Sequence, residues 1–392
     1  MAGTVSLPYH AVFHILSWTP VKSVCRFQCV SKGWRDLISS PVFAAAHKSP
    51  HGPLLVDTGS FQEEEPIQGR DMRLLDMDGN IVRVLKGVGG YRMLCNNSLD
   101  DLICVNGASC GGINVVDPAT GEVLVSCPQM DILEHDAFPY AAQRYYTTFG
   151  FGRAVPSGKY KVFRLGADHT CEVFTIGDGP RRWRRTPQPS PEKICSQRGS
   201  PVVIDGLMHV FHDERFSNHD TLRCFDLESE LWKADVIQGP LKLSDESRSH
   251  GTVAICLTEL NGALCFIQSV FGDIYGSTGK EIADPFTNIW ILDNAPDKRS
   301  WIKAYTITMA PSMCRYMPLR VMDDGEKLLL QCSFDKGYDE GWSLVLQIYD
   351  PSTNTCTDIP GTPHDLAGRI GLFSLRDNTT MAGDKLHLNL IF

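Results

Sequence analysis

Three histidines, His209, His212 and His219, are the residues whose type and spacing come closest to a metal site. A bound zinc ion needs its His ligands to converge on one point. The surrounding residues follow a β-strand pattern, and side chains three positions apart on a strand point to opposite faces. Two of the three histidines therefore do not converge, and we expect no metal centre here.

Cys25 and Cys29 are a second arrangement that could do chemistry, because they lie one helical turn apart. A redox or metal pair would need reactive thiols, whereas buried structural cysteine is the commoner state. We therefore expect ordinary packing. No Ser/His/Asp set and no carboxylate pair recurs at a spacing that the fold would bring together, so we assign no catalytic residue and no cofactor.

The composition is that of an ordinary globular protein of 392 residues, with 43% hydrophobic and 21% charged side chains. A net charge of -9 argues against nucleic acid as a partner, because phosphate neutralisation needs a basic surface. We find neither the ~18 consecutive apolar residues of a membrane span nor the charged start of a secretory signal, and so expect no membrane partner. The 14 cysteines are then expected as free thiols, in the cytoplasm, the nucleus or both.

The first part of the chain differs from the rest in charge and in pattern. Residues 1–50 hold five basic side chains and one acidic side chain, a net charge of +4, which leaves -13 on the remainder. Apolar residues at helical spacing predict three short helices. The third helix is expected to carry an apolar stripe of Val30, Trp34, Leu37 and Ile38. Two prolines and a glycine at 49–53 cannot continue a helix, so we predict a small all-α domain over residues 1–49.

From residue 50 onward the chain repeats one arrangement of short strands. Each copy has an apolar strand, a tight turn, a second strand, a variable loop, a third strand ending in Asp, and a fourth strand that often carries Trp. The six copies cover residues 54–85, 99–127, 160–186, 201–236, 253–307 and 318–360. This is the spacing of kelch-like propeller blades, and packing such sheets around an axis buries both faces of each. We predict a multidomain chain in which the small all-α domain precedes an all-β propeller of about six blades over residues 50–392.

The first copy lacks its opening strand. Strand-like segments remain near the end of the chain, at 370–375 and 386–392. We predict that one of them completes the first blade, because closure leaves fewer open sheet edges.

Two motifs that suggest other activities fit the blade pattern better. Gly150 and Gly152 lack the third glycine and the following helix of a dinucleotide-binding loop, so we expect close backbone packing inside a blade. The basic run at 181–185 occupies a fourth-strand position. We therefore expect Trp183 to pack and its Arg neighbours to be solvated.

The N-terminal helices carry one pattern over some forty residues: Leu7-Pro8, Ile15-Leu16, Pro20-Val21-Lys22-Ser23, Val30-Ser31-Lys32 with Trp34, and Leu37-Ile38-Ser39-Ser40-Pro41-Phe43. This pattern resembles an F-box. Two positions depart from it, because Thr19 stands where Leu is usual and Gln28 where Arg is common. Further on, residues 147–165 and 115–124 resemble the F-box-associated domain abundant in plant F-box proteins, through a Gly-Phe-Gly…Tyr-Lys-Val segment and a strand ending in a Pro-Thr turn.

These resemblances imply a non-catalytic substrate-recognition subunit of a Skp–cullin–F-box ubiquitin ligase. The F-box would bind a Skp-type adaptor, and through it a cullin–RING ligase, while the propeller presents an unknown protein substrate. Catalysis would then come from proximity. The same resemblance places ten residues at or just behind the adaptor interface: Leu7, Pro8, Ile15, Leu16, Pro20, Val21, Val24, Val30, Lys32 and Trp34.

Recognition by the propeller is expected on one rim. Tight turns at Asp205-Gly206, Asn261-Gly262 and Asp324-Gly325 join first and second strands. The loops between second and third strands, together with the crossovers between copies, meet on the opposite rim and are long and variable, as is usual for recognition loops. Aromatic residues are favoured anchors. We therefore predict six substrate-binding residues in these loops: Phe61, Tyr140, Phe216, Phe271, Tyr275 and Phe286.

Two other functions fit the same sequence. One is a propeller enzyme or small-ligand sensor coupled to an F-box. The other is an F-box protein that acts outside the ligase.

Overall fold

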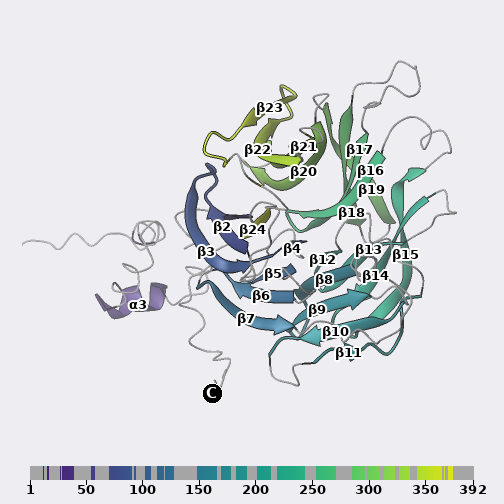
Figure 1. Cartoon of the computed structure of the whole chain (residues 1–392), viewed down its shortest axis with the longest axis horizontal. Coiled ribbons are helices and arrows are strands. Elements are labelled where there is room, and N and C mark those ends of the chain that lie inside the picture. Colours follow the sequence, from purple (N-terminus) through teal and green to yellow (C-terminus); the bar gives the residue numbers. More distant parts are fainter. Residues whose placement is uncertain are drawn as a thin grey trace, which may run out of the picture.

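The computed structural model describes a defined part of the chain: residues 12, 16, 27, 29–38, 54–57, 70–90, 92–93, 102–106, 113–118, 120–127, 148–165, 169–177, 182–191, 201–212, 219–242, 253–270, 285–295, 298–308, 313–322, 326–335, 342–363, 366 and 370–373. Residues 12, 16 and 27 are helical, and helix α3 (Lys32–Ile38) precedes six four-stranded antiparallel sheets arranged in a ring (Figure 1). No helix in the described part is long and apolar enough to cross a membrane.

Each sheet forms one blade of a propeller, as the sequence repeats predict. Blade 1 contains β24 (Gly371–Phe373), β1 (Leu54–Asp57), β2 (Arg70–Leu75) and β3 (Ile81–Gly89). Blade 2 contains β4 (Arg92–Met93), β5 (Ile103–Asn106), β6 (Ile113–Asp117) and β7 (Glu122–Cys127). Blade 3 contains β8 (Thr148–Arg153), β9 (Tyr160–Leu165), β10 (Cys171–Thr175) and β11 (Arg184–Arg185).

The second half of the ring has longer strands. Blade 4 contains β12 (Val202–Ile204), β13 (Leu207–Phe211), β14 (His219–Asp226) and β15 (Leu231–Lys242). Blade 5 contains β16 (Val253–Leu260), β17 (Ala263–Val270), β18 (Phe286–Ala295) and β19 (Lys298–Thr308). Blade 6 contains β20 (Met313–Met322), β21 (Lys327–Asp335), β22 (Trp342–Asp350) and β23 (Thr355–Asp358).

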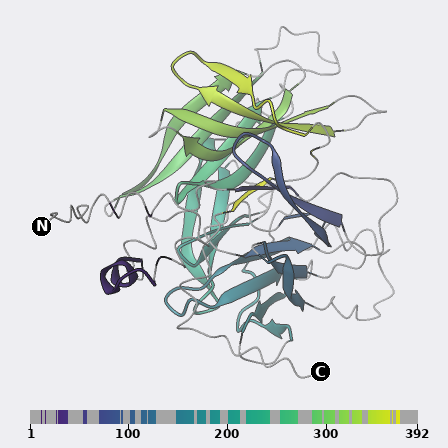
Figure 2. The ribbon, with the colours of Figure 1, turned by 90° about the vertical axis from the view of Figure 1, so that its left-hand side faces the viewer.

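The first strands of neighbouring blades line the centre of the ring, where β8 contacts β12, β12 contacts β16 and β16 contacts β20. The end of the chain supplies the first strand of blade 1. Residues of β24 pair antiparallel with β1, with Leu372 opposite Leu55 and Gly371 opposite Val56. Figures 1 and 2 show this yellow strand among the purple and blue strands of blade 1, with α3 outside the ring. The prediction that a terminal segment completes the first blade is confirmed, and the segment is the one beginning near residue 370.

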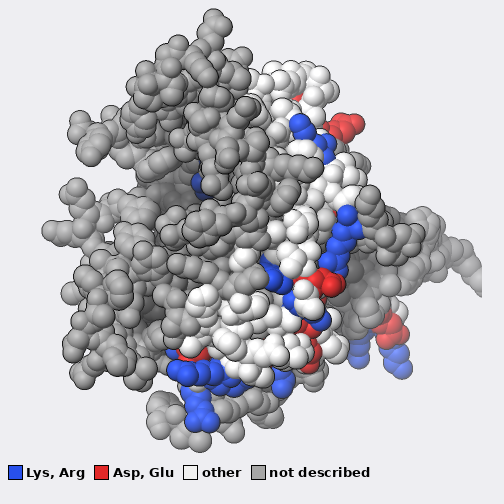
Figure 3. Space-filling model, turned by 90° about the vertical axis from the view of Figure 1, so that its right-hand side faces the viewer, with Lys and Arg blue, Asp and Glu red and all other residues white. Residues whose placement is uncertain are grey.

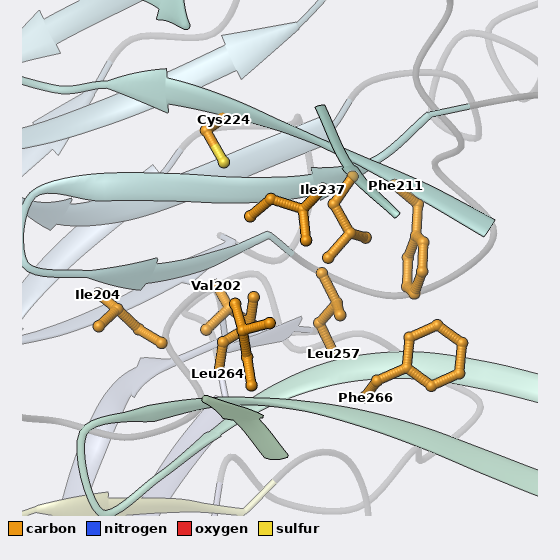
Figure 4. Close-up of a cluster of buried hydrophobic side chains, with 10 residues drawn as sticks. Val202, Ile204, Phe211, Cys224, Ile237, Leu257, Leu264 and Phe266 are labelled. Atoms are coloured by element: carbon orange, nitrogen blue, oxygen red, sulfur yellow. The ribbon is translucent and has the colours of Figure 1, made fainter. Parts of the chain in front are cut away.

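Six clusters of buried apolar side chains hold the ring together, and each joins two neighbouring blades. Between blades 4 and 5, for example, Val202, Ile204 and Phe211 face Leu257, Leu264 and Phe266 (Figure 4). The cluster between blades 6 and 1 joins Leu329 and Leu346 to Leu55 and Leu75, so the ring is closed by packing as well as by strand pairing.

Side chains alternate between the two faces of each strand, which explains why one blade packs against two neighbours. In β17, Leu264 and Phe266 pack toward blade 4, whereas Cys265 between them packs toward blade 6. Successive side chains of a strand point to opposite faces, and here both faces are buried. The strands therefore read as continuous apolar runs and not as alternating ones.

The Asp that ends the third strand of many copies closes the turn into the fourth strand. In blade 4 the Asp226 carboxylate accepts hydrogen bonds from the backbone N–H groups of Glu228 and Ser229, at 2.9 and 3.2 Å. Asp350 accepts a similar bond from the N–H of Ser352 at 2.9 Å in blade 6. Asp side chains stabilise turns in this way, so the repeated Asp is structural.

The first-to-second strand turns are tight, as predicted, where they are described. Asp205 and Gly206 have φ of 48° and 76°, and Asn261 and Gly262 have φ of 51° and 83°. Two successive residues with positive φ form the type I′ turn that fits the twist of a hairpin. The third predicted turn, at 324–325, lies outside the described residues.

The two glycines of blade 3 pack closely, but against the neighbouring blade. A Cβ atom at Gly150 would lie 2.5 Å from Sδ of Met208, and one at Gly152 would lie 2.5 Å from Cγ1 of Val203. Both partners belong to blade 4, so the expected packing inside a blade is corrected to packing between blades. The third copy also begins at Thr148 and not at residue 160, because the glycine segment is itself strand β8.

A buried ion pair adds a polar contact between blades 3 and 4. Lys161 and Glu230, whose side chains are 7% and 8% exposed, lie 2.7 Å apart, from Nζ to Oε1. The Lys161 ammonium also donates to the carbonyl oxygen of Leu227, and the Arg184 guanidinium binds both carboxylate oxygens of Glu230. Burial raises the pKa of Glu230, but the hydrogen bonds from Arg184 and Lys161 outweigh it and hold the pKa below its ordinary value.

Replacing Phe266 by Ala should destabilise the propeller by about 3–5 kcal/mol, because it opens a cavity between two blades. Phe266 is fully buried and makes edge contacts with Phe211 and Trp301, at ring-centroid distances of 5.7 and 5.9 Å. Urea denaturation of the full chain measures the loss. Ile302→Ala, at a side chain that is 54% exposed, is the control and should change stability by no more than about 0.5 kcal/mol. Equal losses in the two variants would contradict the packing described here.

Glu230→Gln should destabilise the chain by about 3–5 kcal/mol near neutral pH, because it leaves the buried Lys161 ammonium without its counter-charge. The folded pKa of Glu230 is lowered from 4.5. Its stabilising contribution is therefore complete above about 4.5 and is lost as the pH falls through the folded pKa. The difference in urea midpoint between wild type and variant should shrink below that pH. The exposed Glu122, changed to Gln, is the control, and a difference that stays constant with pH would contradict the ion-pair account.

Candidate adaptor-binding and substrate-binding surfaces

Helix α3 begins after a serine cap. The backbone N–H of Trp34 donates to Oγ of Ser31 at 3.1 Å, and the N–H of Arg35 donates to the Ser31 carbonyl oxygen at 3.0 Å. A serine at this position satisfies a backbone donor that would otherwise lack a partner. The helix therefore starts at Lys32, and Val30 lies in the turn before it.

A small core lies beneath this helix. Leu16, Leu37 and Ile38 are 1%, 3% and 7% exposed. Phe27 and Trp34 pack edge to face at their border, with ring centroids 5.6 Å apart. Of the predicted adaptor-binding residues, Leu16 thus lies in the core of this unit and Trp34 lies half-buried at its edge.

The predicted helical stripe was wrong at Val30. Its side chain is 60% exposed, whereas Phe27, earlier in the chain, is partly buried and packs against the core. Val30 and Lys32 are instead both exposed, directly before and at the start of α3. Cys29 is exposed as well, so the expectation of ordinary packing for this thiol is also wrong.

The remaining predicted adaptor-binding residues lie outside the described part of the chain: Leu7, Pro8, Ile15, Pro20, Val21 and Val24. The boundary predicted at residues 49–50 lies outside it too, and both stay predictions.

One predicted substrate-binding aromatic is described. Phe286 is the first residue of β18, half-buried and paired with Val270 and Thr308, so it belongs to a strand and not to the loop in which we expected it. It lies where a second-to-third strand loop ends, at the rim predicted for recognition. Phe61, Tyr140, Phe216, Phe271 and Tyr275 lie outside the described residues.

The two described histidine side chains of the possible metal triplet have separate partners. The buried His209 ring approaches the carbonyl oxygen of Val202 through Nδ1 at 3.3 Å, and Nδ1 of His212 lies 3.3 Å from Oγ1 of Thr221. Burial lowers the pKa of His209. Among the described residues, no group of three His, Cys, Asp or Glu side chains could hold a metal ion.

The basic run of blade 3 is built into the fold, largely as predicted. Trp183 packs edge to face on Phe174, with ring centroids 5.7 Å apart, and the Arg164 guanidinium lies 4.1 Å from the Trp183 ring centre. Arg182 and Arg185 are exposed. Arg184 is exposed as well, but it also binds Glu230 of the next blade. On the face shown in Figure 3, groups of Lys and Arg lie next to Asp or Glu side chains.

Most described cysteines are core residues. Cys104, Cys171, Cys224, Cys256, Cys265 and Cys332 are free and buried. Burial raises the pKa of Cys224 to about 11 and that of Cys265 to about 12. Nucleophilic cysteines need a lowered pKa, so burial and a raised pKa fit a packing role for Cys224 and Cys265.

A hollow of about 80 Å³ lies at the centre of the ring, between blades 5 and 6 and the start of β24. Its polar lining consists of Arg315, Thr258, Gln331 and Ser333, and its apolar lining includes Met317 and Ile370. The Gln331 side-chain oxygen accepts a hydrogen bond from the N–H of Ile370 at 3.0 Å. Sequence reasoning missed this hollow, because its residues meet only when three blades close the ring.

A helical unit followed by a six-bladed propeller defines the class of this chain as a two-part protein. Comparisons with known proteins agree with this. A model of the F-box domain matches residues 5–44, and a model described as F-box associated beta propeller domain matches residues 87–364. The second match covers more than half of the chain, and the chain belongs to this family of F-box proteins.

Individual relatives are similar along most of their length. The F-box protein At5g10340 of Arabidopsis thaliana is 26% identical over 403 residues, covering 92% of this chain and 82% of that protein. The F-box protein At1g11270 of the same plant is 28% identical over 284 residues, covering 67% and 86%. Among solved structures, a chain of Kuenenia stuttgartiensis hydrazine synthase aligns with 74% of this chain and 88% of its own length, at 9% identity and a TM-score of 0.41.

An F-box domain indicates binding to a Skp-type adaptor in Skp–cullin–F-box complexes. Together with the propeller, it suggests a substrate-recognition subunit with a non-catalytic role.

Proposed function

We propose that this chain is the substrate receptor of a Skp–cullin–F-box ubiquitin ligase, in which the F-box binds the adaptor and the propeller binds a protein substrate. The observation that carries the proposal is the joint presence of the F-box and the closed six-bladed ring on one chain. The chain itself forms and breaks no bond in this function. It raises the effective concentration of a substrate lysine near the conjugating enzyme.

The exposed start of α3 supports the adaptor-binding half of the proposal. Val30 is an apolar side chain that is 60% exposed, and the neighbouring Lys32 is an exposed cation. Residues 1–50 carry a net charge of +4, which suits an acidic partner. The core of Leu16, Leu37 and Ile38 is small, and domains of this size gain stability when they dock.

The buried thiols support a reducing compartment as the place of action. We propose the cytoplasm, the nucleus or both, since the six buried cysteines in the described strands are free. The substrate is a protein, and comparison of ubiquitylated proteins in cells with and without this chain is the direct way to find it.

The double substitution Val30→Asp and Lys32→Glu should weaken capture by a purified Skp-type adaptor at least about tenfold, which corresponds to about 1.4 kcal/mol. Both side chains are exposed, so the variant should fold normally, with an unchanged Tm. Trp34→Ala is less informative, because Trp34 also borders the core. Capture is measured by pull-down or calorimetry with the full chain.

Asp36→Asn, exposed on the same helix and outside the predicted interface, is the matched control and should bind as the wild type does. Failure of the wild-type chain to capture the adaptor would sink the ligase proposal and favour a role outside the ligase. Equal capture by all three chains would overturn the placement of the interface at Val30 and Lys32.

A further inference from the structure

We propose that the hollow centred on Arg315 binds an anionic side chain of the protein substrate. This inference rests on the proposed receptor function and gives the substrate a chemical feature. The shared chemistry is a carboxylate or a phosphate group on a peptide, which the guanidinium of arginine recognises through two parallel hydrogen bonds.

The first support is the state of Arg315. It is half-buried on β20, and within the described part of the chain its side chain makes neither an ion pair nor a hydrogen bond. None of the described residues that line the hollow is acidic. A cation partly removed from water without a counter-charge costs free energy, and an anion entering the hollow would remove that cost.

The second support is the neighbouring donor. Ser333 lies directly opposite Arg315 in the β20–β21 pairing, and both side chains line the hollow. The guanidinium and the Ser333 hydroxyl therefore converge on one space. A planar fork with an adjacent hydroxyl is a set of donors suited to oxygen atoms of an anion.

The size of the hollow decides what kind of ligand fits. Sites for cofactors and drug-sized molecules measure about 300–1,000 Å³, whereas this hollow has about 80 Å³. It accommodates one functional group with part of its side chain. The apolar Met317 and Ile370, which are 8% and 2% exposed, would contact the methylene groups of that side chain.

The position of the hollow matches the rim predicted for recognition. Arg315 is near the start of β20 (Met313–Met322), Ser333 near the end of β21 (Lys327–Asp335), and Ile370 directly before β24. First strands begin and second strands end at the rim that carries the variable loops. A peptide held by those loops can therefore place one side chain into the centre of the ring.

The basic hollow differs in charge from the rest of the propeller, and this difference favours one kind of peptide. Residues after position 50 carry a net charge of -13, so the propeller as a whole does not attract an acidic peptide electrostatically. A single basic hollow then favours one anionic side chain at one place, and like charges elsewhere disfavour a strongly acidic segment.

The test uses the full chain bound to its adaptor and three libraries of nine-residue peptides that are random except for a central Glu, phosphoserine or Gln. We expect the Glu or the phosphoserine library to be retained about tenfold better than the Gln library, as for a hydrogen-bonded charge. Arg315→Gln should abolish the preference. The matched control is Arg320→Gln, on the same strand but outside the lining of the hollow, and it should keep the preference.

Each outcome has a distinct meaning. Retention of the phosphoserine library above the Glu library identifies a phosphate as the source of the charge, and the reverse identifies a carboxylate. Equal retention of all libraries by a chain that captures the adaptor overturns the inference and leaves the proposed receptor function standing.

A larger fall in Tm for Arg315→Gln than for Arg320→Gln would show that an acid of this chain already pairs with Arg315, and would also overturn the inference. A stabilising effect of inorganic phosphate alone, without any peptide preference, would show that the site takes a free anion and not a substrate side chain.

Discussion

The burial of both faces of every sheet is the constraint on which the rest of this structure depends. A four-stranded sheet with apolar side chains on both faces must bury each face against another element, so each blade needs a neighbour on either side. Six clusters satisfy that requirement at six interfaces, and the last of them, between Leu346 and Leu55, forms only if the ring closes. Closure in turn needs β24, which comes from the far end of the chain and pairs with β1. The need to bury both faces of each blade explains three features. These are the continuous apolar strands, the glycines at 150 and 152 that have no side chain, and the pairing of β24 with β1.

Much of this fold could be predicted from the sequence, because the signals that mark a blade are local. The continuous apolar runs, the Asp that closes a turn and the Asn-Gly pair at residues 261–262 each act within a few residues, and their repetition reveals the ring. What could not be predicted depends on contacts between distant segments. Gly152 packs against Val203, and Lys161 forms an ion pair with Glu230. Both contacts join neighbouring blades, and no residue spacing in the sequence predicts them.

The sequence-based prediction was wrong at Val30 and Cys29 for a local physical reason. A periodic stripe from Val30 to Ile38 ignores the serine at 31, whose hydroxyl accepts a hydrogen bond from the N–H of Trp34 and caps the helix that begins at Lys32. Once the helix starts there, Val30 and Cys29 lie outside its periodicity and are exposed, whereas Phe27 packs against the core. Periodicity finds the helix, but the cap decides which residues it includes. That decision matters for function, because it moves Val30 from the interior to a surface where a partner can contact it.

A receptor that acts by proximity makes different demands on its two parts. In the proposed function, the helical unit keeps one surface for a common adaptor, with Val30 and Lys32 exposed near the start of α3. The loops of the propeller can change more freely in sequence, because its stability depends on the interfaces between blades and the loops proposed for recognition lie at the rim. Arg315 combines both properties: the backbone of β20 fixes its position, but among the described residues its side chain has neither an ion pair nor a hydrogen bond. A position of this kind can change the chemistry of recognition without cost to the fold, which is why the ends of the innermost strands are where specificity is best sought.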